Sequence, residues 1–487
     1  MTDIYKNKIF INGEYFNFDI SLNKELVNKV EGVNENLTHS KGLFVNTICF
    51  HQLLMNYELK SNLFLERKCK KVRLKYIGFS TSYLFEIFKR DKIIIVKDHY
   101  YFINRIIHFL LIPTSLIKII FYSILSIFYV FFKSLKQNNS LIFYGESLVL
   151  IHSNTALNKC MKFCISKNEK GTILYDSHKL KINKNYDNFT VIDLYKIVKS
   201  SHLIKVIPEL LKSVFKQTKL IYKEFKQIFG VFSRFYVIFI YADRFFHSVY
   251  VSFVLDFFVK ENVKKIKKII SGEKESRFAI IENNIINKFK IEGVCIPHGL
   301  EYNFKYPKPL FGNIFYATSE NAKNSLEIMY QNIHFIFDET VLKNIYKVFG
   351  HKIQDKKIVF FTDSRNIKLD HFIISFLALE FNDIYVKLHP NDLKDNYSDI
   401  ENINFVNSFN DSICDNIVLT RNSTVLLEGI YNNSTCISII LNTKDKFISN
   451  YLYPSLNNLG IIKIEKLQEL KVLIKKMKKN EIIRLYN

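Results

Sequence analysis

Residues that break regular structure are scarce in this chain of 487 residues, which has 14 glycines and 7 prolines. Their scarcity argues against long flexible linkers, and we find no internal repeat and no low-complexity segment. Because 48% of the residues are apolar and 15% are aromatic, the composition excludes a disordered or collagen-like chain. The length predicts two or three domains and is ample for a sizeable core.

Cysteines are few, and their spacing is not that of a cross-linked or zinc-binding fold. There are 7, an odd number, and no C-x-x-C pair. The pattern disfavours a disulfide framework and a zinc ribbon and fits a reducing cytosol. The N-terminal sequence MTDIYKNKIFINGEYF lacks the apolar run of a secretory signal, so we expect none.

Arginine is scarce although the chain is strongly basic. Lysine and arginine number 69 against 46 acidic residues, a net charge of +23, but only 10 of the 69 are arginine. Such a charge suits nucleic acid, an anionic membrane or an anionic substrate. Base-reading proteins favour the arginine fork, so we expect no nucleic-acid partner. The alternative is a solvated basic surface from an AT-rich genome, since lysine, asparagine, isoleucine, phenylalanine and tyrosine all abound.

Long apolar runs are rare, and residues 106–132 stand out. His108, Pro113 and Lys118 interrupt this segment, and its uninterrupted part has 14 residues. As a helix that part would be about 21 Å long, short of a hydrocarbon core of roughly 30 Å. Basic residues flank the segment on both sides, which favours an element lying in or on an anionic leaflet over one that crosses it. The alternative is a buried core helix.

Helical patterns precede a region of alternating strands and helices. Residues 185–270 are mostly helical in pattern, and residues 232–259 predict a long, partly buried helix. The tail 463–487 predicts an amphipathic basic helix. Further helical patterns lie at 321–330, 367–381 and 423–432. We expect strands at RFAII (277–281), GVCIP (293–297), IFYA (314–317), KIVFFT (357–362), IYVKL (384–388), INFV (403–406), NIVL (416–419) and CISIIL (436–441).

This alternation predicts an α/β fold with parallel sheets covered on both faces. We expect two Rossmann-like domains that face a cleft, residues 1–335 on the acceptor side and residues 350–487 on the nucleotide-donor side. The first domain would carry a helical, membrane-associating insertion around residues 106–132. The charge and this segment together predict a cytoplasmic protein, peripheral to the cytoplasmic face of the inner membrane.

Polar residues beyond the carboxyl ends of strands are the candidate site, because open α/β sheets bind ligands there. Most of the candidates end or follow a predicted strand, and one lies in the loop before RFAII. They are Glu273, His298, Lys387, His389, Pro390, Arg421, Ser423, Thr424 and Glu428.

These residue types suit transfer from a nucleotide-activated donor. Ser423 and Thr424 stand at a helix start, where hydroxyls and backbone amides can hold a phosphate. His389, fixed by Pro390, could donate to the phosphate oxygen as it leaves, and Lys387 could offset its charge.

The remaining candidates would serve the acceptor and the nucleoside. Glu428 could accept hydrogen bonds from a ribose or base, and Glu273 or Glu275 could be the general base for an acceptor hydroxyl. His298 would face the same cleft from the other domain. The plainer alternatives are structural histidines, a simple helix cap and a solvent-facing glutamate. No acidic pair follows a strand as a metal ligand would, so we expect no metal or other cofactor, with Asp363 as a possible exception.

The motifs PHG, KLHP and an N-S-T…E helix start followed by a strand resemble those of a known enzyme group. The sequence is similar to the GT-B-type glycosyltransferases of bacterial surface polysaccharide synthesis over about residues 270–445. Within them it resembles the group of bacterial sialyltransferases, polysialyltransferases and CDP-glycerol glycerophosphotransferases. The resemblance implies that the donor's cytidine phosphate is held by His389, Pro390, Ser423 and Thr424.

The resemblance also implies roles for the other candidates. Glu428 would be the acidic residue of the helix, and His298 matches the PHG histidine of capsule and glycerophosphate transferases. Glu273 would stand at the position of an acidic catalytic base, but its surroundings, GEKESR, depart from the family's acidic pattern.

The function implied is transfer of a sugar from a CMP-, UDP- or CDP-linked donor to a capsule-type or lipopolysaccharide-type glycan or a lipid-linked glycan. A CMP-activated acid sugar such as sialic acid or Kdo is one donor that fits. Two alternatives stay open: a CDP-polyol phosphotransferase of the teichoic-acid type, and a non-catalytic polysaccharide-assembly protein of the same fold.

Overall fold

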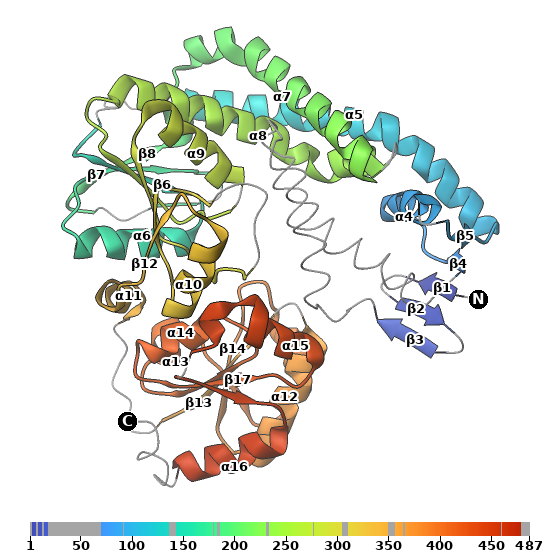
Figure 1. Ribbon diagram of the computed structural model, residues 1–487, viewed down its shortest axis with the longest axis vertical. Helices are drawn as coiled ribbons and strands as arrows, with labels where there is room; N and C mark the ends of the chain where they lie inside the picture. Colours follow the sequence, from blue (N-terminus) through green and yellow to red (C-terminus); the bar gives the residue numbers. More distant parts are fainter. Residues whose placement is uncertain are drawn as a thin grey trace. The chain divides into compact units, whose positions relative to one another are not determined.

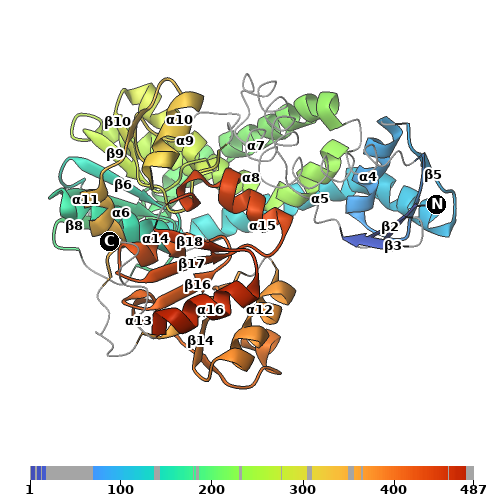
Figure 2. The same cartoon turned by 60° about the horizontal axis from the view of Figure 1, so that its bottom comes forward.

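The computed structural model forms two compact units (Figures 1 and 2). The first comprises Met1–Leu157, Glu169–Cys295 and Lys305–Asn313. The second comprises Asn158–Asn168, Ile296–Phe304 and Ile314–Asn487. The residues described are 2–5, 8–11, 14–17, 70–90, 92–135, 143–178, 180–182, 186–229, 233–275, 277–303, 310–348, 356–363, 366–458 and 460–478.

The first unit supplies five neighbouring strands of a seven-stranded sheet, with β6 (Ser147–Ile151) in the middle of the five. β7 (Gly171–Tyr175) and β8 (Phe189–Asp193) follow on one side of β6, each parallel to its neighbour. β9 (Lys268–Ser271) and β10 (Glu292–Cys295) lie on the other side, also parallel. The order of the strands therefore reverses between β6 and β9, and this is the topology of a Rossmann fold.

Long helices accompany this sheet. α6 (Asn154–Ser166) lies between β6 and β7 in the chain, and α9 (Arg277–Phe289) lies between β9 and β10. α8 (Ser233–Asn262) packs against α9, α7 (Ser200–Phe229) and α5 (His99–Ser134). Figure 1 shows the helices of this group in blue-green to yellow-green.

A smaller sheet belongs to the N-terminal part of the first unit. Its order is β3-β2-β1-β4-β5, with antiparallel pairs among the first three strands and parallel pairs at β1-β4 and β4-β5. α4 (Phe79–Arg90) follows β4 and packs on α5 and α8. The strands are β1 (Thr2–Tyr5), β2 (Lys8–Ile11), β3 (Glu14–Asn17), β4 (Lys71–Leu74) and β5 (Ile94–Ile95).

Two predictions for the first unit were wrong in part. RFAII at 277–281 was predicted as a strand but begins α9, in which Phe278, Ile281 and Ile285 are buried at helical spacing. A five-residue apolar run is too short to separate a strand from a buried helical turn. Residues 185–270, predicted as mostly helical, also contain β8 and β9. The predicted helix at 232–259 is confirmed by α8.

The second unit contains a six-stranded parallel sheet with the same kind of strand order. It runs β15-β14-β13-β16-β17-β18, so β13, the first of these strands in the chain, again lies in the middle. The order reverses between β13 and β16. The strands are β13 (Ile358–Phe361), β14 (Ile384–Lys387), β15 (Ile403–Phe405), β16 (Ile417–Thr420), β17 (Thr435–Ile439) and β18 (Ile461–Ile464).

Both faces of this sheet are buried. Alternate residues of β13 enter two different core clusters, Phe360 on one face and Val359 and Phe361 on the other. Continuous apolar runs are what a parallel sheet covered on both faces requires. The helices between and after the strands are α12 (Ile367–Glu380), α13 (Phe409–Ile413), α14 (Val425–Ile430), α15 (Thr443–Phe447) and α16 (Leu467–Lys478).

The remaining elements of the second unit precede this sheet. β11 (Ile314–Tyr316) and β12 (His334–Ile336) pair in parallel. α10 (Glu320–Met329) lies between them in the chain, and α11 (Glu339–Tyr346) follows them. The predicted strands at GVCIP, IFYA and the five runs from KIVFFT to CISIIL are confirmed by β10, β11 and β13 to β17.

The tail contains a shorter helix than the sequence predicts. β18 occupies the start of the segment 463–487, and α16 follows with Leu470 and Ile474 buried in the core. Residues 479–487 lie outside the described residues.

The predicted fold class is confirmed: two Rossmann-like α/β units with parallel sheets, the first with a large helical elaboration. The two units do not have the predicted bounds of 1–335 and 350–487, because the second unit begins its main segment at Ile314 and also takes in Asn158–Asn168 and Ile296–Phe304. The division into an acceptor-side and a donor-side domain stays a prediction.

Two helices are apolar and long enough to cross a membrane, judged by length and composition alone. They are α5 and residues Arg234–Asn262 of α8. In α8, 61% of the apolar window is buried, as in the core helix of a soluble protein, whereas in α5 only 22% is buried. α5 includes the predicted segment 106–132 and continues through Pro113 without a break.

Candidate active site

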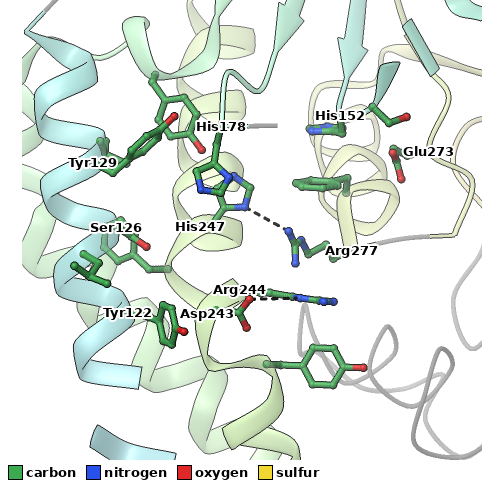
Figure 3. A pocket seen from close by; sticks show the side chains of 17 residues that line it. Tyr122, Ser126, Tyr129, His152, His178, Asp243, Arg244, His247, Glu273 and Arg277 are labelled. Atoms are coloured by element: carbon green, nitrogen blue, oxygen red, sulfur yellow. Dashed lines mark hydrogen bonds and ion pairs between the residues drawn. The ribbon is translucent and has the colours of Figure 1, made fainter. Parts of the chain in front are cut away.

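A cavity of about 900 Å³ lies at the switch point of the first unit (Figure 3). Its walls are formed by residues that follow β6, β7 and β9 and by parts of α5, α8 and α9. The topology and the cavity therefore indicate the same place for a ligand. The polar residues that line it are Tyr122, Ser126, Tyr129, His152, Ser153, His178, Tyr195, Tyr241, Asp243, Arg244, His247, Glu273 and Arg277.

His152 directly follows β6 and is held between a carboxyl group and an aromatic ring. Its Nε2 lies 2.9 Å from Oε1 of Glu282 on α9. Its ring stacks on Phe278, with centroids 3.7 Å apart and planes 4° apart. Burial raises the pKa of the Glu282 carboxyl, and the hydrogen bond from His152 opposes that rise. The two side chains form a buried imidazole and carboxyl pair.

The hydrogen bond to Glu282 decides what the other ring nitrogen of His152 can do. With the proton on Nε2, the Nδ1 atom carries a lone pair. Nδ1 is buried and has no hydrogen-bond partner among the described residues. A buried acceptor without a hydrogen-bond donor destabilises the folded protein unless a ligand supplies the donor. An acceptor hydroxyl would supply it, and His152 could then take the hydroxyl proton as a base oriented by Glu282.

A second imidazole and carboxylate pair lies in the same unit. Asp176 follows β7, is fully buried, and its Oδ2 lies 3.0 Å from His247 Nε2 on α8. Burial opposes ionisation of Asp176, but His247, His152 and the backbone N–H of His178 outweigh it and lower the pKa below its usual value. Arg277 Nη2 lies 3.5 Å from His247 Nδ1. Asp176 therefore stays ionised and orients His247.

Two guanidinium groups line the cavity. Burial, and next the charge of Arg244, lower the pKa of Arg277 to about 10, which leaves Arg277 charged at neutral pH. The Nε of Arg277 is buried without a hydrogen-bond partner among the described residues. Arg244 has Asp243 beside it, with Nε and Oδ2 3.9 Å apart. The cavity can thus hold an anionic group of a ligand.

Glu273, predicted as a catalytic base, lines this cavity. It lies in the loop between β9 and α9, and its backbone N–H donates to Ser271 Oγ at 3.2 Å. Only 7% of the residue is exposed, so the alternative of a solvent-facing glutamate does not hold.

The predicted donor residues lie at the switch point of the second unit. β14 and β16 flank β13 in parallel, so their carboxyl ends lie at one edge of the sheet. His389 follows β14, and its backbone N–H donates to Thr362 Oγ1, which follows β13, at 2.9 Å. Ser423 and Thr424 follow β16. The sheet brings the strand ends that carry these residues to the same edge.

His389 has the tautomer that a phosphate would need. The backbone N–H of Asn391 donates to His389 Nδ1 at 3.2 Å. Because Nδ1 accepts, the proton of the neutral ring is on Nε2. His389 and Pro390 are both exposed. The ring can present Nε2–H to an anionic ligand at this edge.

The other predicted donor residues make contacts within the protein. Lys387 Nζ donates to the carbonyl of Asn407 at 2.7 Å, and burial lowers the pKa of this amine. Ser423 Oγ accepts from the backbone N–H of Val425 at 3.3 Å. Thr424 is the N-cap of α14 and makes no side-chain capping bond. α14 has only 6 residues, so its dipole adds little.

Arg421 is surrounded by carboxylates. Its nitrogens lie 2.8 Å from Asp370 and 3.3 Å from both Asp363 and Asp445. With three carboxylates around one guanidinium, burial raises the pKa of Asp370 to about 7 in spite of Arg421. These contacts give Arg421 a structural role, and its predicted donor contact stays a prediction.

His298 and Glu428 are linked through a lysine of α6. Lys159 Nζ lies 3.1 Å from Glu428 Oε1 and donates to the carbonyl of His298 at 3.3 Å. Its ammonium also lies over the Tyr346 ring, 4.6 Å from the centroid. His298 and Glu428, which are far apart in the sequence, therefore lie close together. The Glu428 carboxylate forms an ion pair with Lys159.

The paired groups of the first unit were not predicted from the sequence. The signal was present: SLVLI and GTILY are short apolar runs, and polar residues follow each of them, His152 after the first and Asp176 after the second. Their partners Glu282 and His247 lie on helices, where no spacing rule singles them out. Among the described residues, no group of three or more His, Cys, Asp or Glu side chains could hold a metal ion.

Comparison with known proteins gives no family. No protein-family model and no curated protein matches the chain. Solved structures with a similar fold include UDP-GlcNAc 2-epimerase from Neisseria meningitidis bound to UDP-GlcNAc, with 12% identity, a TM-score of 0.40 and coverage of 70% of this chain and 94% of that one. Another is Arabidopsis thaliana UGT89C1 complexed with quercetin, with 9% identity, a TM-score of 0.40 and coverage of 69% and 90%. At these scores the proposals below rest on the site alone.

Proposed function

We propose that the chain is a nucleotide-sugar-dependent glycosyltransferase that elongates a surface polysaccharide or a lipid-linked glycan. The observation that carries the proposal is the buried His152 and Glu282 pair at the switch point of the first unit, with Nδ1 unpaired among the described residues in a large cavity.

The acceptor is activated in this cavity. Its hydroxyl donates to His152 Nδ1, and the proton passes to Nδ1 as the oxygen forms its bond to the anomeric carbon of the donor sugar. Glu282 offsets the positive charge that develops on the imidazole. Glu273, which lines the cavity, accepts a hydrogen bond from a neighbouring sugar hydroxyl.

The donor is held by the second unit. The bond between the anomeric carbon and the phosphate oxygen breaks, and the electron pair leaves with the nucleotide. His389 Nε2–H donates to this phosphate, and the backbone amides and hydroxyls of Ser423 and Thr424 contribute further hydrogen bonds. Direct transfer needs donor and acceptor within bonding distance, so the proposal includes the cleft between two domains that the sequence predicts.

The test is consumption of a donor by the purified full chain. CMP-sialic acid, UDP-GlcNAc and CDP-glycerol are each incubated with the protein, and release of nucleotide and the shift of the melting temperature are measured. The proposal expects that one sugar nucleotide raises the melting temperature and is hydrolysed slowly even without acceptor.

The other outcomes select the alternatives. Consumption of CDP-glycerol alone would favour a polyol phosphotransferase. If no nucleotide is consumed and none shifts the melting temperature, the glycosyltransferase proposal fails and a non-catalytic assembly protein takes its place.

A further inference from the structure

Most of the buried residues of α5 are polar, whereas its exposed face is apolar. Its buried residues are Asn104, His108, Leu111, Ser115, Ile119, Ser123, Val130 and Ser134. A helix on the surface of a protein in water normally turns its polar face outward. The exposed large apolar residues of α5 are instead Phe102, Ile103, Ile106, Phe109, Leu110, Leu116, Ile117, Ile120, Phe121, Ile124, Leu125, Phe128 and Phe132.

Specific hydrogen bonds fix this orientation of the helix. The Nδ2 of Asn104 donates to the Tyr76 carbonyl at 2.8 Å, and its Oδ1 accepts from the Gly78 backbone at 3.2 Å. His108 Nδ1 lies 3.2 Å from the Ser82 carbonyl. Rotating α5 to bury its apolar face would break these bonds and leave buried polar groups unpaired.

The helix lies along a surface and is not surrounded by lipid. Its 36 residues extend over about 54 Å at 1.5 Å per residue. Buried residues recur from Asn104 near its start to Ser134 at its end. One side is therefore in contact with protein over the whole length, and a bilayer would meet only the other side.

Charge favours an anionic bilayer. α5 contains no acidic residue but includes Arg105, Lys118 and Lys133. α7 packs on α8 and α5. Among its described side chains, α7 exposes one glutamate, Glu209, and the lysines Lys205, Lys212, Lys216, Lys219 and Lys223. Basic side chains beside an apolar helical face are the pattern of interfacial membrane binding.

The same helix is a wall of the cavity. Tyr122, Ser126 and Tyr129 line the cavity, one helical turn apart on one side of α5. Leu125 both lines the cavity and is 47% exposed, so it stands at the rim. The apolar face and the cavity are continuous at this residue.

We propose that the exposed face of α5 lies in the interface of an anionic bilayer and that the cavity takes the head group of a membrane-anchored acceptor. The hydrocarbon part of the acceptor stays in the bilayer beside Leu125, and Arg244 and Arg277 bind an anionic group of its head. The identity of the acceptor rests on the proposed function, whereas the docking of α5 does not.

Flotation with lipid vesicles tests the docking. The full chain is mixed with vesicles of phosphatidylcholine alone or of phosphatidylcholine with phosphatidylglycerol. The proposal expects binding to the anionic vesicles. The variant I117D/F121D/F128D should lower the bound fraction about tenfold or more, because three exposed apolar side chains are replaced by charges. The variant K212A/K216A/K219A should weaken binding to anionic vesicles only.

A matched control comes from the second unit, where Ile328, Leu379 and Leu393 are also exposed. The variant I328D/L379D/L393D should bind vesicles as the unaltered chain does. The docking is overturned if the unaltered chain does not float, if the α5 variant floats equally well, or if the α5 substitutions instead abolish a dimer.

Activity on two forms of one acceptor separates this inference from the proposed function. Transfer to a glycan anchored in vesicles should fall in the α5 variant in proportion to the lost binding, while transfer to the same glycan without its lipid should be unchanged. Equal loss on both forms overturns the membrane role. No transfer by any variant, with vesicle binding intact, would contradict only the transferase proposal.

Discussion

The switch points of the two units share a strand order but differ in their chemistry. In the first unit, the groups beyond the strand ends are buried in pairs, His152 with Glu282 and Asp176 with His247, and line or adjoin a cavity of about 900 Å³. In the second unit, His389 is exposed, and three carboxylates surround the buried Arg421 guanidinium.

The difference indicates a division of labour between the two units. A base must be oriented and shielded from water before it takes a proton, which the buried pair provides. A nucleotide phosphate needs exposed N–H donors that it can reach from solvent, which His389 and the neighbouring loops provide. In the proposed function, the same topology serves proton transfer in the first unit and binding of the nucleotide phosphate in the second.

The largest effect is expected from removing the base. H152A should lower kcat about 10²-fold to 10⁴-fold, the usual contribution of general base catalysis. Donor binding, measured as the shift of the melting temperature with nucleotide, should not change.

H202A is the matched control for H152A, since His202 is exposed on α7. It should transfer at the normal rate. An H152A enzyme with normal kcat would break the comparison, because His152 would then not be the base.

The next effect is expected at Glu282. E282Q keeps an oxygen that can accept from His152 Nε2–H but removes the charge that offsets the imidazolium. We expect kcat to fall about 10-fold to 100-fold with the acceptor KM unchanged, because a carboxylate beside a catalytic histidine orients the ring and stabilises its protonated form. A fall in acceptor affinity with normal kcat would mean that Glu282 only shapes the cavity. E292Q, at the exposed start of β10, serves as the control.

A smaller effect is expected at the donor end. H389A should weaken nucleotide binding about tenfold, as expected for loss of one hydrogen bond to a charged group. H389Q, which keeps an N–H donor, should recover part of the affinity. H371A is the control, because His371 lies in the same unit and pairs with Asp399. If H389A and H371A bind nucleotide equally well, the phosphate is held elsewhere.

The smallest effect on transfer is expected around Arg421. The pKa of Asp370 is raised to about 7, so the folded chain keeps this proton between pH 4 and 7 while the unfolded chain loses it. Proton binding by Asp370 therefore stabilises the folded chain by about 1–3 kcal/mol, and this stabilisation is complete below the unfolded pKa of about 4. It is lost as the pH rises through about 7, the pKa of Asp370 in the folded chain.

Melting temperatures from pH 4 to 8 check this expectation. The melting temperature of the unaltered chain and of the control D383N should fall as the pH rises towards 7. The melting temperature of D370N should lack this fall. Parallel curves for all three would mean that Asp370 is ionised throughout. Transfer at neutral pH should be nearly normal in any D370N that folds.

The sequence predicted the second unit well because its apolar runs are continuous and polar residues follow them. KIVFFT and IYVKL allow no amphipathic helix, since both faces of their strands are buried. Lys387, His389 and Ser423 were then chosen as candidates by position alone, and their role stays a prediction. Their actual hydrogen-bond partners, such as Thr362 for the backbone of His389, could not be read from spacing.

The first unit was harder because its site is assembled from helices. RFAII has the composition of a strand, yet Phe278, Ile281 and Ile285 take helical spacing once the next residues are included. Glu282 is 130 residues from His152, and only the packing of α9 beside β6 brings them together. Long-range pairing of this kind leaves no periodic trace in one sequence.

The most direct test of the account is the position of the acceptor in a complex of the full chain with nucleotide and acceptor. We predict that the reacting hydroxyl oxygen lies about 2.6–3.2 Å from His152 Nδ1, within hydrogen-bond reach. An acceptor bound outside the first-unit cavity, or one whose hydroxyl is held by another base while His152 Nδ1 faces protein, would contradict the account.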